Sequence, residues 1–213
     1  MPATVSINGV VLDSVGVKYT GNSSYSPGRV KNPFNLSLDE FVSGNDYQDY
    51  TSIKLANVFG DPSFIREVLS YEIAGKYLYA PKANFAQIYI NGSYIGLYSN
   101  TETVNKSFCK RTYGSKNNTF MSCSPADEPT VATKSNLRYI SNNYQDYESA
   151  YELKSSSGWD YFIALCDTVT NVPDSLEHVL DIDKFIWMCA FNNILGNIDS
   201  YIGVYSQNYY FVS

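Results

Sequence analysis

The sequence predicts an α+β fold with two lobes, in which a strand-rich first lobe holds one main helix and the second lobe is helical. Two observations support this prediction. The first half alternates apolar and polar residues in short runs bounded by turn signals, whereas from Ala150 onward apolar residues recur at helical spacing. With 213 residues, 44% of them apolar, the chain can bury a core in one large domain or in two small lobes.

Short strands and tight turns are expected in the first lobe. The dipeptides Asn8-Gly9 and Asn91-Gly92 each stand between alternating arms, and this pattern predicts two hairpins. The run PFNLSLDEFV also alternates strictly. It therefore predicts a further strand with one apolar face, formed by Phe34, Leu36 and Leu38.

One main helix is expected over residues 61–78 of this lobe. Asp61 can cap the helix, Pro62 suits its first position, and apolar residues then repeat at helical spacing. A short amphipathic segment follows the second hairpin at residues 103–111. We therefore place the strand-rich lobe at residues 1–111.

A polar connector is expected at residues 112–148, because this segment is rich in Asn and Ser. The helical lobe follows at residues 149–213. Its second helix pattern, DIDKFIWMCAFNNIL, is apolar nearly all round and predicts a buried helix. The last stretch, SYIGVYSQNYYFVS, has the composition of strands.

Charge and hydropathy exclude several classes of partner. The formal net charge is −6 and no basic stripe is present, so no nucleic-acid partner is expected. No apolar run approaches the roughly 18 residues that a membrane-spanning helix needs. The oligomeric state cannot be predicted from the sequence.

The four cysteines do not predict a metal site. They form no CxxC or CxxH pair and the chain has a single histidine, so no zinc site is expected. Cys166 and Cys189 lie in apolar helical patterns typical of inert core thiols. Cys109 and Cys123 flank a polar loop, and a disulfide between them is an open alternative for a secreted protein.

Several stretches together resemble the CotH family, whose members are spore-coat and surface-associated proteins with an atypical protein-kinase fold. The stretches are VGVKYTGNSS, DPSFIREVLSYEIA, IYINGSYIGLYSNTETVNKSF and LDIDKFIWMCAFNNILGNIDSYIGVYSQNYYF. They occur in the family's order and extend over nearly the whole chain. The resemblance implies a two-lobed kinase-like fold that binds ATP with Mg²⁺ and phosphorylates Ser or Thr of a protein substrate. It also implies an extracellular, cell-surface or spore-coat location.

Asp199 is the candidate catalytic residue. It stands in a turn at residues 196–201, after a strongly apolar helix pattern, and phosphoryl transfer needs a rigidly placed carboxylate near the attacking hydroxyl. By the resemblance, it matches the Asp of the family's N-x-D-S-Y motif. From the residues alone, a solvated turn or a helix-capping Asp is equally open.

Asn208 is the candidate metal ligand, because an Asn that follows the catalytic Asp can hold Mg²⁺ through its carbonyl oxygen. The spacing is longer than in ordinary protein kinases. The alternative is that Asn208, like its neighbours Asn192, Asn193 and Asn197, satisfies backbone groups of a loop.

Four further residues are candidates for nucleotide binding. In kinases a helix Glu pairs with a strand Lys that grips the phosphates, and here Glu67 with Lys18 or Lys31 could form this pair. Glu102, after the second hairpin, falls where a hinge would contact the sugar or base of the nucleotide. The alternatives are a Glu that favours the helix dipole, solvated lysines, and a surface Glu that opens the following helix.

Two departures from the family pattern concern the nucleotide site. Some relatives are expected to carry a lysine where this chain has Thr20 and another where it has Asn35. A neutral side chain cannot supply the point charge that phosphates need. Either Lys18 or Lys31 substitutes, or nucleotide binding is weakened.

The sequence stops before the second metal-binding Asp that the family carries in a W-D segment after the N-Y-Y strand. We therefore expect an incomplete catalytic domain with little activity and with exposed apolar surface in the second lobe. The alternative function is a non-catalytic surface, adhesion or spore-coat scaffold module on the same fold. A glycosidase-type carboxylate pair is not indicated, since no two acidic residues are aligned by the pattern.

Overall fold

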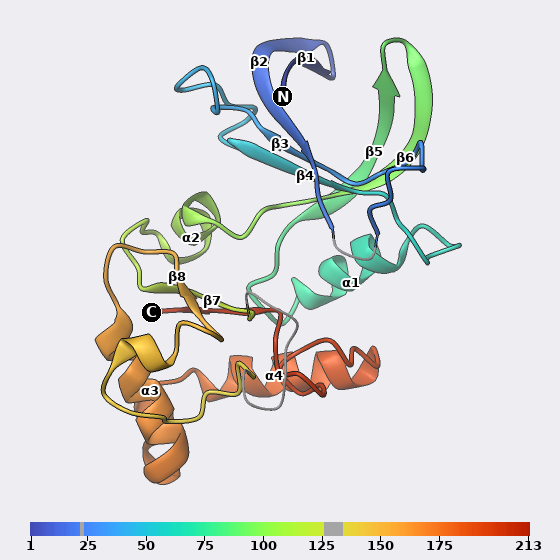
Figure 1. Ribbon diagram of the computed structural model, residues 1–213. Helices are drawn as coiled ribbons and strands as arrows, with labels where there is room; N and C mark the ends of the chain where they lie inside the picture. The colour runs from blue at the N-terminus through green and yellow to red at the C-terminus, as the bar shows by residue number, and fades with distance from the viewer. Residues whose placement is uncertain (22–23, 126–133) are drawn as a thin grey trace. The chain divides into compact units, whose positions relative to one another are not determined.

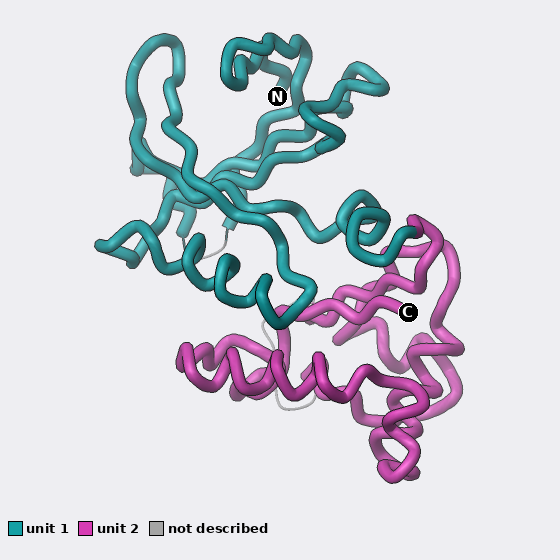
Figure 2. Tube along the Cα trace, turned by 180° about the vertical axis from the view of Figure 1, so that it is seen from behind, with its two compact units in different colours: residues 1–114 teal, residues 115–213 magenta. Residues whose placement is uncertain are grey.

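A computed structural model describes residues 1–21, 24–125 and 134–213. The chain divides into two compact units, Met1–Gly114 and Ser115–Ser213, which are coloured separately in Figure 2. Strands and helices are mixed, so the predicted α+β class is confirmed. In the described ranges, no helix has both the length and the apolar character needed to cross a membrane.

A curled antiparallel sheet forms most of the first unit (Figure 1). Its six strands lie in the order β1-β2-β3-β4-β6-β5, and each neighbouring pair is antiparallel. The strands are β1 (Pro2–Ile7), β2 (Val10–Tyr19), β3 (Phe34–Ser37), β4 (Ser52–Ala56), β5 (Ala83–Ile90) and β6 (Ser93–Thr101).

Both predicted hairpins are confirmed. Asn8 and Gly9 join β1 to β2, and Asn91 and Gly92 join β5 to β6. All four residues have positive φ, between 49° and 88°, as a two-residue turn between right-twisted strands requires. These turns fix the registers of the two hairpins. The register of β6 matters because residues of this strand form part of the candidate site.

One face of the sheet carries the apolar core of this unit. The predicted inward residues of β3 and the segment after it are confirmed, since Phe34, Leu36 and Leu38 are all buried. They cluster with Val15, Leu55 and Tyr98, the last of which is fully buried. Side chains alternate between the two faces along a strand, so the residues between these apolar ones project from the opposite face. That face is polar.

The main helix of the first unit is α1 (Arg66–Ala74), which is shorter than the predicted range 61–78. The residues before it form turns held by Asp61, whose carboxylate accepts from the backbone N–H of Arg66 at 2.9 Å and of Ser63 at 3.0 Å. The prediction that Asp61 is the N-cap and Pro62 the first helical residue was wrong, because the N-cap is Ile65 and Asp61 binds the first N–H of the helix from the preceding turns. These hydrogen bonds hold its pKa below the usual value, although desolvation opposes them.

Helix α2 (Lys106–Tyr113) follows β6. The side chain of Asn105 caps it by accepting from the N–H groups of Ser107 at 2.8 Å and Phe108 at 3.1 Å. The helix ends at Gly114, whose φ of 76° is the left-handed conformation that terminates many helices. The boundary between the two units lies directly after this residue.

The second unit combines a small sheet with helices. Its strands lie in the order β8-β7-β9, and the segment predicted as a connector supplies β7, which pairs with β9 at the end of the chain. Strand β9 covers only part of the stretch predicted as strands, since residues 201–208 form turns and irregular backbone. The elements are β7 (Phe120–Cys123), η1 (Tyr144–Asp146), β8 (Glu152–Leu153), α3 (Trp159–Asn171), η2 (Pro173–His178), α4 (Ile182–Ile194) and β9 (Tyr209–Val212).

The core of the second unit forms around α3. Phe162 is fully buried and its ring lies 4.6 Å from the ring of Tyr151 and 5.8 Å from that of Phe211, measured between centroids. Met121 on β7 and Cys166 on α3 are also fully buried in this cluster. The sheet and α3 therefore bury each other's apolar faces.

The prediction that α4 is a buried helix was wrong. None of its residues is buried, and Ile186 and Ile194 are 59% and 82% exposed. A helix that is apolar all round needs partners on every side, and within the second unit the described elements cover only one side. That covered side includes Phe185, whose ring lies 5.3 Å from the ring of Tyr201.

The alternative of a disulfide between Cys109 and Cys123 is also not realised. Both thiols are free and buried, and they belong to different units, Cys109 to α2 and Cys123 to β7. Cys166 and Cys189 are free as well. Burial raises the pKa of all four thiols.

Candidate functional site

A row of polar side chains crosses the first sheet on the face opposite the apolar core. The strand register places Lys18 opposite Asn35, Asn35 opposite Lys54, and Lys54 opposite Thr101. Directly opposite residues in antiparallel strands project from the same face. Two lysines and two neutral polar residues therefore line one face of four adjacent strands.

Glu67 of α1 reaches this same face. Its carboxylate accepts from the hydroxyl of Thr101 at 2.7 Å and also from the hydroxyl of Ser99. Ser99 and Thr101 lie two positions apart on β6 and so share a face. The helix thus places an acidic group beside the row. From the sequence, this position of Glu67 could be predicted only through the resemblance to the CotH family.

The predicted ion pair between Glu67 and a lysine is absent from the described residues. The ion pairs found there within 4.0 Å are Arg66–Asp61, Arg111–Glu102, Lys154–Glu152 and Lys184–Asp183. Both oxygens of Glu67 are held by hydroxyl groups instead. The carboxylate is thereby fixed in position by hydroxyl groups.

Lys31 lies on the other face of the sheet from Glu67. Its ammonium nitrogen is 5.2 Å from the ring centroid of Tyr98 and 4.6 Å from that of Phe64, at cation–π distances. Tyr98 neighbours Ser99 in β6, so the two side chains project from opposite faces. Burial lowers the pKa of Lys31. Of the two cations singled out in the sequence, only Lys18 shares a face with the partners of Glu67.

Lys54 was missed by the sequence reasoning. It lies on β4, the strand directly before α1, and the register sets it opposite Thr101, the residue that binds Glu67. A lysine on the strand that precedes the glutamate-bearing helix is the arrangement protein kinases use to grip nucleotide phosphates. The run SIKLA, which alternates before the helix start, was the available signal.

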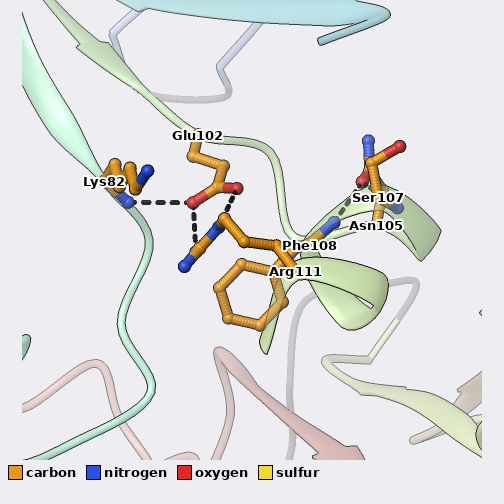
Figure 3. A network of polar contacts seen from close by, with 6 residues as sticks. All are labelled: Lys82, Glu102, Asn105, Ser107, Phe108 and Arg111. Atoms are coloured by element: carbon orange, nitrogen blue, oxygen red, sulfur yellow. Dashed lines mark hydrogen bonds and ion pairs between the residues drawn. The ribbon is translucent and has the colours of Figure 1, made fainter. Parts of the chain in front are cut away.

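Glu102 is held in a network at the end of β6 (Figure 3). Its carboxylate accepts from Arg111 twice, from Nε at 3.0 Å and from Nη2 at 2.6 Å, and from the backbone N–H of Lys82 at 3.0 Å. Only 5% of its side chain is exposed. The carboxylate therefore joins the start of β5, the end of β6 and helix α2, and its oxygens already have partners.

Asp199 stands in the turn after α4, as predicted. Gly196 breaks the helix with a φ of 60°, and the side chain of Asn197 then accepts from the N–H of Asp199 at 3.3 Å. One carboxylate oxygen of Asp199, Oδ1, accepts from the side-chain amide of Gln207. Within the described part of the second unit, this leaves Oδ2 with no hydrogen-bond partner. Asp199 itself is exposed.

The structure brings Asn208 and Asp199 together. The side-chain amide of Asn208 donates to the backbone carbonyl of Asp199 at 3.1 Å, and its own backbone N–H donates to the hydroxyl of Ser124 at 3.2 Å. Asn208 has a φ of 59°, which Asn tolerates better than most residues. Asn208 therefore makes the loop-stabilising contacts expected if its role is only structural. It also lies beside Asp199, the candidate catalytic residue.

The oxygen donors near Asp199 fit Mg²⁺ only as a partial set. The described ranges contain no group of three or more His, Cys, Asp or Glu side chains placed to hold a metal ion. Asp199 and Asn208 supply one carboxylate and one amide oxygen. Mg²⁺ in phosphoryl-transfer sites commonly takes one or two protein oxygens and completes its shell with phosphate and water. Such a pair is compatible with a metal that arrives with its nucleotide.

The family model described as CotH kinase protein matches residues 17–213, a range that includes every residue of the candidate site. A search of curated proteins found no match.

Proposed function

Because the chain belongs to the CotH kinase family, we propose that it binds ATP with Mg²⁺ and transfers phosphate to a Ser or Thr hydroxyl of a protein. The observation that carries this proposal is the row of Lys18, Asn35, Lys54 and Thr101 beside Glu67. A cationic row on a rigid sheet, next to a fixed carboxylate, is the chemistry that a triphosphate requires.

The first unit contributes the phosphate-binding groups. Lys54 and Lys18 place ammonium groups on the face that Glu67 borders, and the intervening Asn35 offers an amide donor between them. Glu67 orients the adjacent polar groups and can pair with Lys54 when the phosphates draw that side chain in. Glu102 acts by fixing β5, β6 and α2, while its contact with the nucleotide sugar stays a prediction.

The second unit contributes the base. In the proposed step the substrate oxygen attacks the γ-phosphorus, the bond from that phosphorus to the β,γ-bridging oxygen breaks, and ADP leaves. The hydroxyl proton passes to Oδ2 of Asp199, while Gln207 holds Oδ1 in place. Asn208 would hold Mg²⁺ through its side-chain carbonyl oxygen, and the ion would supply positive charge against the phosphates.

The substrate and the location follow from the family and are proposals here. Family members are spore-coat and surface proteins, so we propose a Ser/Thr-containing surface or coat protein as the phosphate acceptor and an extracellular, cell-surface or spore-coat location. The net charge of −6 gives no reason to expect a nucleic-acid partner.

A second candidate function is a non-catalytic surface or scaffold module on the same fold. The observation that favours it is the state of Glu67, whose carboxylate is held by two hydroxyls and not by a lysine. A fold kept for binding alone has no need of the ion pair that positions ATP.

A transfer assay with γ-labelled ATP and Mg²⁺ distinguishes the two. We expect weak transfer of label to a Ser/Thr-containing acceptor, and Asp199→Asn to reduce that transfer by about 100-fold or more, since general base catalysis contributes roughly that factor. Lys110→Met, at an exposed position on α2, is the matched control and should leave transfer unchanged. No transfer by folded protein that also shows no Mg·ATP-dependent rise in Tm would support the scaffold function instead.

A further inference from the structure

The tip of the β5–β6 hairpin carries an acceptor sequence for N-linked sugar. Residues Asn91-Gly92-Ser93 follow the pattern Asn-x-Ser, in which the middle residue is not Pro. All three are exposed, and a Cβ built on Gly92 would meet no atom within 4 Å. The hairpin extends away from helices α1 and α2 of its own unit (Figure 1). The tip therefore has space for a bulky covalent group.

The turn explains the first two residues of this sequence but not the third. Asn91-Gly92 has the positive φ angles that a two-residue turn requires, and Asn8-Gly9 has them too. The earlier turn is followed by Val10, a residue typical of strands, and the amide of its Asn donates to the hydroxyl of Tyr47 at 3.2 Å. Only the second hairpin follows its turn with a hydroxyl residue, Ser93, which completes the acceptor sequence.

Two exposed tyrosines flank the tip. Tyr89 and Tyr94 are opposite one another in the register, their ring centroids are 5.2 Å apart, and the residues are 58% and 55% exposed. Residues 83–101 contain no charged side chain. A sugar ring presents C–H groups that pack on the negative face of an aromatic ring, while its hydroxyl groups stay in water. The pair therefore offers a surface against which the first sugar of a glycan can lie.

The other Asn-x-Ser/Thr sequences are less suitable where the structure describes them. Asn35 is half-buried on β3 between the two lysines of the candidate site, so a sugar there would project over the proposed phosphate groups. Asn105 is half-buried and held as the cap of α2. Asn117 is exposed, but Thr119 of its acceptor sequence is buried. Asn22 lies outside the described residues.

We propose that Asn91 carries an N-linked oligosaccharide when the chain is secreted through a compartment that contains a lipid-linked oligosaccharide donor and its transferase. This inference rests on the proposed extracellular location and not on phosphate transfer. In the step, the amide nitrogen of Asn91 attacks the anomeric carbon of the sugar on a lipid pyrophosphate. The bond from that carbon to the pyrophosphate oxygen breaks, one amide proton passes to a base of the transferase, and the lipid pyrophosphate leaves.

Expression with a cleavable secretion leader in a eukaryotic host tests the site. Peptide N-glycosidase in heavy-oxygen water converts each glycosylated Asn to a labelled Asp, which peptide mass spectrometry locates. We expect label at Asn91 in most molecules and none at Asn35. Ser93→Ala should abolish the label at residue 91, Ser93→Thr should keep it, and Asn8→Gln, the control at the matching turn, should leave it unchanged. Secreted and cell-associated chains are both analysed, so poor secretion of a variant does not hide the result.

Thermal unfolding tests the contact with the tyrosine pair. The glycosylated wild type should melt about 2 °C or more above Ser93→Ala, which lacks the sugar but keeps the turn. This difference should disappear in a Tyr89→Ser background and persist with Tyr161→Ser, a control at an exposed position on α3.

Absence of sugar from Asn91 in both the secreted and the cell-associated chain would overturn the proposal. A difference in Tm that survives Tyr89→Ser would overturn the contact with the tyrosine pair. A chain that carries the glycan but transfers no phosphate would overturn the proposed kinase activity and leave this inference standing.

Discussion

Replacing Glu102 by Gln should destabilise the first unit by more than its place near the surface suggests. The side chain is 5% exposed and that of Arg111 is 35% exposed, and the substitution deletes the charge that accepts both guanidinium bonds. The new amide also turns an NH₂ group toward the Arg111 donors. Hydrogen bonds to charged groups contribute about 1.5–3 kcal/mol each, and partial rehydration of Arg111 offsets some of the loss. We expect the free energy of unfolding to fall by about 2–3 kcal/mol.

Urea unfolding followed by circular dichroism measures this loss, and hydrogen exchange shows where it acts. Protection should fall in the segments that Glu102 joins, namely the start of β5 and helix α2. The matched control is Glu152→Gln, which breaks an ion pair whose side chains are 39% and 65% exposed, and it should cost less than about 1 kcal/mol. If the two substitutions cost the same, the buried network does not join these elements as the structure indicates.

Three further predictions concern the conformation and chemistry of single residues. Gly158→Ala should destabilise the second unit by about 2–4 kcal/mol in urea, because φ there is 136° and a Cβ would lie 2.4 Å from Thr119. A thiol reagent under native conditions should label Cys189, which is half-buried, well before the fully buried Cys123, and peptide mass spectrometry would show the reverse order if the core of the second unit is misplaced. Burial raises the pKa of Tyr98 to about 12, so the stability it contributes should be complete below pH 10 and be lost as the pH rises from 10 to 12. Urea midpoints of wild type and Tyr98→Phe should therefore draw together across that range, and a difference between them that stays constant with pH would show that this ionisation has no part in alkaline unfolding.

The sequence was sufficient where the signal is local. The two Asn-Gly turns and the alternating run of β3 predicted a hairpin, a second hairpin and a buried face that the structure confirms. Asp61 was wrongly placed as the N-cap, since α1 begins only at Arg66 after Ile65, but its carboxylate does accept from the first N–H of the helix.

The sequence was insufficient where distant strands decide the outcome. Lys31 and Lys54 are each single lysines in short runs of the first unit, and only the register shows that Lys54 shares a face with the partners of Glu67 while Lys31 lies against Tyr98. The bonds of Glu102 to Arg111 likewise depend on how α2 turns back after β6. The exposure of α4 could not be predicted, because an apolar pattern shows what a helix can bury but not what its neighbours cover.

Nucleotide binding by lysine variants tests the central claim most directly. Isothermal titration with a non-hydrolysable ATP analogue and Mg²⁺ should show that Lys54→Met weakens binding at least tenfold, a loss of about 1.4 kcal/mol or more. Lys31→Met should change affinity less than about threefold, because that ammonium lies on the opposite face of the sheet. Unchanged binding by Lys54→Met together with a large loss in Lys31→Met would contradict the assignment of the phosphate site to the face that Glu67 borders.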